Sequence, residues 1–120
     1  MSTRAVYKFY NRATNDSVIF WRQHDGYPNG WFGALERIRS VVALAHFDNL
    51  ALIYDLMKVL EASEVKDEMV ADKLDQQHRY TVDLDDGQVT LTHYDWQIGK
   101  KHHYLLTADG WKQRWMADAE

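Results

Sequence analysis

The spacing of apolar residues changes twice along this chain, and this change constrains the fold more than any other feature. Residues 5–10 and 17–23 alternate with the two-residue period of β-strands, and a polar segment separates them. From residue 31 the period lengthens to three or four residues, which is typical of amphipathic helices. Beyond residue 80 the two-residue period returns. The sequence therefore predicts strands at both ends of the chain and helices between them.

The middle of the chain predicts two or three helices. The first begins near Trp31, with Asn29 or Gly30 at its cap. Asp48 is the expected N-cap of the second helix, whose broad apolar surface ends where charged residues return. A third helix is expected over residues 64–74. Its apolar residues are few, so we expect one of its faces to be solvated.

The last third of the chain predicts a second hairpin and two further elements. Residues 80–84 and 89–91 alternate on either side of an Asp-Asp-Gly turn at 85–87. A fifth strand is expected at residues 103–106. Two tryptophans one helical turn apart predict a short helix over residues 111–117.

These elements predict one α+β domain over residues 1–120. We expect an antiparallel sheet of four or five strands, with two or three central helices packed on one face. The chain has 120 residues, of which 46% are hydrophobic, which is enough for a single core. No stretch has the composition of a linker.

Charge and cysteine content exclude several classes of function. The formal net charge of -4 argues against a protein that binds nucleic acid through its phosphates. The chain has no cysteine, which excludes disulfides, thiolate metal sites and cysteine nucleophiles. The first residues lack the apolar core of a signal peptide, and no stretch approaches the length of a membrane span. We therefore expect a cytoplasmic protein with no membrane partner.

Six histidines raise the question of a metal site. His102 and His103 are adjacent and would point to opposite faces of a strand. The other four lack a ligand partner four residues away on one helix: His24, His46, His78 and His93. We therefore interpret the histidines as structural and expect neither a metal ion nor another cofactor.

His24 and Asp25 are the candidates for catalysis. The pair resembles the His-Asp dipeptide of some metal-dependent phosphohydrolases, but it lies in a turn rich in glycine and proline. A carboxylate that caps the turn is the simpler interpretation of Asp25. A metal-dependent hydrolase or nuclease centred on His24 and Asp25 is therefore the alternative function.

Two segments favour protein binding. Aromatic residues crowd around the junction of the second strand and the first helix, and large aromatic side chains anchor interfaces. Acidic residues gather in the predicted third helix, where their spacing can imitate a row of phosphates. A packed core and a solvated face are the simpler interpretations of these two patterns. The predicted binding residues are Trp21, His24, Asp25, Tyr27, Trp31, Glu64, Asp67, Glu68 and Asp72.

The chain begins with Ser-Thr-Arg-Ala at residues 2–5 and carries His-Asp-Gly-Tyr-Pro at residues 24–28, before the first predicted helix. These motifs resemble those of a family of small uncharacterised proteins from phages, prophages and bacteria. The resemblance covers about the first 45 residues and implies a protein of a mobile element. Short phage proteins without catalytic motifs often bind and block a host factor, as anti-CRISPR and other anti-defence proteins do.

We therefore expect a small binding protein of phage type that inhibits a host defence factor by protein-protein contact. The expected partner is a host protein or complex, with a CRISPR effector as one candidate. No direct contact with nucleic acid is expected. A homodimer or larger homo-oligomer, in which exposed aromatic residues meet their own copies, is a third hypothesis.

Overall fold

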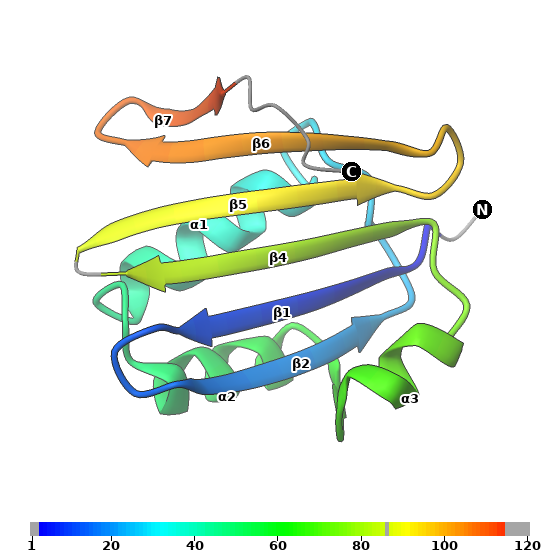
Figure 1. The fold of residues 1–120 in the computed structure, drawn as a ribbon, viewed down its shortest axis with the longest axis horizontal. Coiled ribbons are helices and arrows are strands. Elements are labelled where there is room, and N and C mark those ends of the chain that lie inside the picture. The colour runs from blue at the N-terminus through cyan, green and yellow to red at the C-terminus, as the bar shows by residue number, and fades with distance from the viewer. Residues whose placement is uncertain (1–2, 86, 115–120) are drawn as a thin grey trace.

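The structure is a computed structural model, and it describes residues 3–85 and 87–114. In this part of the chain three helices and seven strands form an α+β fold (Figure 1). In chain order they are β1 (Ala5–Asn11), β2 (Asp16–Arg22), α1 (Ala34–Leu44), α2 (Leu50–Val59), β3 (Ser63–Val65), α3 (Glu68–Lys73), β4 (His78–Asp85), β5 (Gln88–Asp95), β6 (Lys100–Thr107) and β7 (Gly110–Arg114).

All seven strands belong to one mixed sheet, in the order β3-β2-β1-β4-β5-β6-β7. β1 and β4 run parallel, and every other neighbouring pair is antiparallel. The two predicted hairpins are confirmed as β1–β2 and β4–β5. The prediction of four or five antiparallel strands is wrong. The helical segment between β2 and β4 returns the chain to the free side of β1, and such a long connection permits parallel pairing.

The helices α1 and α2 lie behind the sheet in Figure 1 and cover one of its faces. Alternate residues of β1 and β4 point to this face, as the two-residue period predicts. They pack with apolar residues from both helices into the main core, which includes Tyr7, Phe9, Phe20, Ile38, Val42, Ile53, Met57, Tyr80 and Val82.

The prediction of two or three helices on one face is confirmed for α1 and α2, whereas the third helix, α3, covers part of the opposite face. A second, smaller apolar cluster lies there, formed by Val6, Ile19, Val65 and Ala71. Val6 and Ile19 alternate with the core-facing residues of their strands. Because their side chains are apolar, they need a cover on this face, and α3 supplies it.

The first helix begins three residues later than predicted, because the preceding loop stays extended around Gly33. Gly33 is the N-cap of α1. The first amides of the helix bond back into the loop: Ala34 donates to the Tyr27 carbonyl (2.8 Å) and Leu35 to the Pro28 carbonyl (3.1 Å). Trp31 therefore lies outside the helix and does not pack in the core.

The second helix begins at Leu50, and its N-cap is Asn49 rather than Asp48. The Asn49 side chain accepts a hydrogen bond from the Leu52 amide at 3.1 Å. Asp48 instead belongs to a turn in which its amide donates to the His46 carbonyl (3.0 Å). The prediction was wrong by one residue because both side chains can cap a helix.

The predicted helix over residues 64–74 is wrong in part, and the predicted helix over residues 111–117 is wrong where the structure describes it. Residues 64–74 divide into the strand β3, where Glu64 pairs with Phe20, and the shorter helix α3. Residues 110–114 form the edge strand β7, not a helix. Trp111 lies opposite Leu106 there, and residues 115–117 of that prediction lie outside the described residues.

Candidate functional site

Four predicted binding residues lie in the loop between β2 and α1: His24, Asp25, Tyr27 and Trp31. Gly26 fixes this loop to the start of the sheet. Its amide donates to the Thr3 carbonyl (2.8 Å), and its carbonyl accepts from the Tyr80 hydroxyl (2.5 Å). A Cβ atom on Gly26 would lie 2.7 Å from the Thr3 oxygen, so only glycine fits.

Asp25 contributes to holding this loop in place. Its carboxylate lies 3.8 Å from Arg22 Nη1 and 3.9 Å from Arg37 Nη2. The same arginines bind backbone oxygens, Arg22 that of Leu60 and Arg37 that of Asp25 itself. His24 is exposed, and its carbonyl accepts from Arg22. Within the described residues, His24 and Asp25 belong to no group of three metal-binding side chains.

Trp31 and Phe32 lie at one end of an apolar groove between α1 and α2. The groove has a volume of about 490 Å³, and its apolar lining includes Trp31, Phe32, Val41, Leu44, Leu56 and Val59. Trp31 is 87% exposed and Val59 is 79% exposed. Exposed apolar residues gathered in one groove are typical of binding surfaces. The sequence analysis predicted Trp31 but missed the residues that α2 contributes.

The predicted acidic residues have partners within the molecule. Glu68 forms ion pairs with Lys8 and Arg79, and Asp72 also pairs with Arg79. Asp67 caps α3, since its side chain accepts from the Val70 amide (2.9 Å). Their charges are therefore partly balanced where they stand.

The remaining predicted residues divide between the two faces of the sheet. Glu64 lies on β3 and accepts a hydrogen bond from the Tyr54 hydroxyl at 3.3 Å. Trp21 packs against the small cluster under α3, and its indole donates to the Asp75 carbonyl (2.8 Å). Tyr27 is 37% exposed, on the loop that leads to Trp31. The structure thus brings Trp21 near the acidic helix but separates it from the apolar groove.

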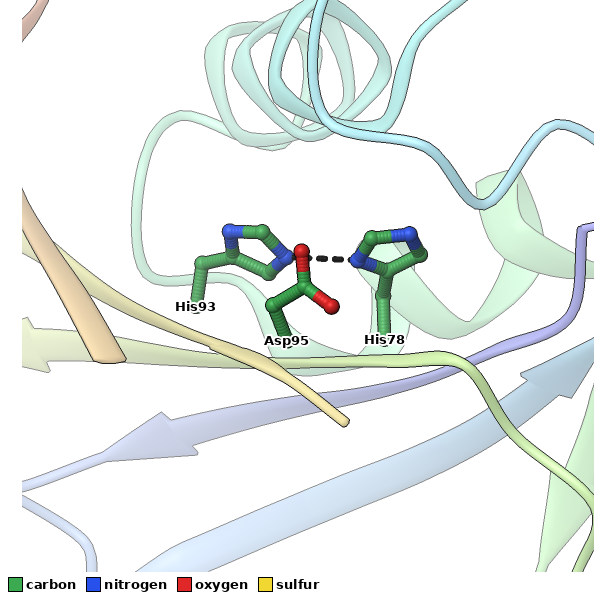
Figure 2. A group of neighbouring side chains, drawn as sticks. All are labelled: His78, His93 and Asp95. Atoms are coloured by element: carbon green, nitrogen blue, oxygen red, sulfur yellow. Dashed lines mark hydrogen bonds between the residues drawn. The ribbon is translucent and has the colours of Figure 1, made fainter. Parts of the chain in front are cut away.

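Three side chains at one end of the β4–β5 hairpin form a group that the sequence analysis missed. Nδ1 of His78 lies 2.8 Å from Nε2 of His93. An Asp95 carboxylate oxygen joins them, and the three ligand atoms all lie within 4.8 Å of one another. Figure 2 shows the Asp95 carboxylate beside the gap between the two rings. Two imidazole nitrogens and one carboxylate oxygen are a ligand set for transition metals.

Stacked rings hold His93 in this position. The Tyr80 ring on β4 stacks on His93 with a centroid distance of 4.7 Å. The His102 ring on β6 also stacks on His93, with a centroid distance of 5.6 Å. Tyr80 in turn stacks on Tyr7 (5.3 Å). These side chains come from β1, β4, β5 and β6 and share the helix-covered face. A row of aromatic rings therefore crosses the sheet beside the histidine pair.

Burial keeps both histidines neutral. Desolvation lowers the pKa of His93 to about 4, and the nearby His78 and His102 add to this effect. Desolvation also lowers the pKa of His78, with Asp95 acting in the opposite direction. On the same face, burial raises the pKa values of Tyr7 and Tyr80. At neutral pH each imidazole thus has an unprotonated nitrogen, which is the form that binds metals.

The pairing register explains why helical spacing failed to find this group. In the β4–β5 hairpin His78 lies opposite Asp95, and Tyr80 lies opposite His93. The pairs stand next to each other on one face, although 15 residues separate the two histidines along the chain. Extending the predicted hairpin back from its turn would have placed His78, His93 and Asp95 together.

Comparisons with protein-family models, curated proteins and solved structures find no match to this chain. In the part of the chain that the structure describes, no helix has the length and apolar character needed to cross a membrane.

Proposed function

We propose that this protein is a small binding protein that inhibits a host protein by protein-protein contact, and that the groove between α1 and α2 forms the contact. The observation that carries the proposal is the exposure of Trp31, Leu44 and Val59 along one groove, at 87%, 63% and 79%. Transfer of such side chains out of water drives association, and tryptophan is a common anchor of interfaces.

The groove has the surroundings of a protein contact. Glu36 and Ser40 add polar groups to its lining. An apolar centre with polar groups beside it is the usual composition of an interface. We therefore assign the groove to an apolar segment of the partner.

The charge of the protein narrows the class of partner. A formal net charge of -4 favours approach to a positively charged surface. Host defence proteins that handle nucleic acid have such surfaces, and the resemblance of residues 2–5 and 24–28 to phage proteins favours inhibition as the outcome. The proposed partner is thus a basic host defence protein with an exposed apolar segment.

The acidic residues of α3 have a secondary role in this proposal. Glu68 and Asp72 are bound to Arg79, so their removal would weaken the fold as well as any contact. Glu64 is the better probe of negative charge, because it is exposed and its side chain accepts a hydrogen bond from the Tyr54 hydroxyl. We expect charge reversal at Glu64 to slow association and the groove to determine affinity.

Capture from host lysate at about 0.15 M salt tests the proposal, because this ionic strength screens weak contacts between charges. The tagged protein is compared with Trp31→Ala and Val59→Ser, two changes within the groove. Ile98→Ser is the matched control, since Ile98 is 60% exposed but outside the groove lining. We expect one host complex to be retained by the wild type and by Ile98→Ser, and to be lost with both groove variants.

Purified components then test the inhibition. The activity of the captured complex should fall as wild-type protein is added and should be unaffected by Val59→Ser. Equal capture by all four proteins would exclude the groove as the contact. A complex that contains only further copies of this chain would support the homo-oligomer hypothesis and contradict the proposal.

A further inference from the structure

We propose that His78, His93 and Asp95 form a binding site for a divalent first-row transition metal ion, with zinc as the representative. The group is the only one of its kind among residues 3–85 and 87–114, and it lies away from the groove of the proposed function. The inference is therefore independent of what the groove binds.

The distances within the group are close to those of a coordination sphere. Ligand atoms at about 2.1 Å from an ion are separated by about 3.0 Å at octahedral angles and about 3.4 Å at tetrahedral angles. The nitrogens of His78 and His93 are 2.8 Å apart and face each other across the hairpin (Figure 2). The carboxylate oxygen lies within 4.8 Å of them, so a small rotation of Asp95 closes the set.

Asp95 is placed to serve as the third ligand. Its Oδ1 accepts a hydrogen bond from the Gln97 amide (2.9 Å), which orients the carboxylate at the end of β5. The side chain is only half-buried, in contrast to His78 (5% exposed) and His93 (2% exposed). An ion can therefore enter from the Asp95 side, and water can complete its coordination.

Nε2 is the nitrogen of His93 that faces a partner, Nδ1 of His78 at 2.8 Å. Nδ1 of His93 is buried without a hydrogen-bond partner, which is a cost to the folded state that an ion at Nε2 does not remove. The rings of Tyr80 and His102 occupy its flanks, so the polar contact of this imidazole lies at Nε2. A bond from Nε2 to a metal ion is stronger than a hydrogen bond between two neutral imidazoles.

Direct metal titration tests the site. The protein is treated with a chelator, dialysed at neutral pH, and titrated with zinc by calorimetry and with cobalt by visible absorption. We expect one ion per chain and the absorption bands of cobalt bound to nitrogen and oxygen ligands. Asp95→Asn preserves the side-chain shape and the oxygen that accepts from Gln97, and it should weaken binding by at least about tenfold.

Two controls separate this site from other histidines. His102→Gln changes a ring that stacks on His93 but is outside the group, and it should leave the stoichiometry unchanged. The double change His24→Ala and Asp25→Ala removes the loop alternative and should also leave binding intact. Loss of binding in the double variant, with binding retained in Asp95→Asn, would assign the ion to the loop and overturn the proposal.

Nitrogen NMR of the wild-type imidazoles tests the site without a substitution. Zinc should shift Nδ1 of His78 and Nε2 of His93 and leave the ring of His24 unchanged. Spectra that show a hydrogen bond between the two imidazoles and do not respond to zinc would identify a purely structural pair. That result, or the lack of binding at one ion per chain, would overturn the proposal.

Discussion

The groove between α1 and α2 and the surface around α3 are both exposed, but they differ in how their side chains are partnered. Around α3, Glu68 and Asp72 form ion pairs with Arg79, and Asp67 caps its own helix. Around the groove, Trp31 and Val59 are apolar and largely exposed. Closely spaced acidic side chains can thus find partners within the fold. Exposed apolar side chains contribute stability only when another surface covers them.

Substitutions in the apolar packing beneath the two surfaces should have the largest effects on the free energy of unfolding. Phe20 and Ile19 are neighbours on β2, and they point to the main core and to the small cluster under α3. We expect Phe20→Ala to lower the free energy of unfolding by about 3–5 kcal/mol and Ile19→Ala by about 2 kcal/mol. Urea unfolding measures both. An equal or larger loss in Ile19→Ala would show that the α3 face is as tightly packed as the helix-covered face.

Acid should lower the free energy of unfolding, because His93 is buried on the helix-covered face of the sheet. Its pKa is lowered to about 4 in the folded protein, while an unfolded histidine titrates near 6.5. The unfolded state therefore binds more protons between these values, so the stabilisation is complete above about pH 6.5 and is lost as the pH falls towards 4. The loss at His93 should be of the order of 3 kcal/mol.

Urea unfolding at several pH values, with chelator present, measures this effect. His93→Gln is the comparison, because it removes the buried imidazole and keeps a polar side chain at the same position. The wild type should lose more stability than the variant between pH 7 and pH 4.5. Parallel curves for the two proteins would contradict the assignment of the acid sensitivity to His93.

The ion pairs around α3 should have a smaller effect. Glu68→Gln removes the contacts to Lys8 and Arg79. We expect a loss of about 1 kcal/mol, because the Arg79 side chain is mostly buried and Asp72 remains as a partner. Glu64→Gln serves as the control and should change the free energy of unfolding by less than about 0.5 kcal/mol. Similar values for the two variants would show that the pairs around α3 are as weak as ordinary surface contacts.

The groove residues should have the smallest effect on stability. Val59→Ser changes an exposed side chain, so the free energy of unfolding should shift by no more than about 0.5 kcal/mol. Thermal unfolding checks this value. A large loss would mean that Val59 supports the fold, and the effect of the variant on partner capture would then have a structural cause.

Local patterns predicted the two hairpins, because alternation and turn residues lie within a few positions of each other. The rest of the sheet depends on distant partners. Glu64 is part of a strand only because β2 offers it a pairing edge at Phe20, and β1 lies beside β4 across a long connection. The sequence around β7 is short and its tryptophan spacing is equally typical of a helix, so pairing with β6 decided its structure.

The two sites differ in how far the sequence could predict them. The histidine group follows from the hairpin register, since pairing of Asp85 with Gln88 leads directly to His78 opposite Asp95. The groove depends on how α1 packs beside α2, and no local pattern specifies which residues of two amphipathic helices stay exposed. Trp31 was predicted from its aromatic neighbours, whereas Val59 required the structure.

The most direct test of the binding proposal is covalent capture at Val59. A photo-crosslinking amino acid is placed at position 59 in one protein and at position 98 in a control, and both are irradiated in host cells. The proposal predicts one host protein attached at position 59 and none at position 98. The same products from both positions, a product made only of this chain, or no product at position 59 would contradict it.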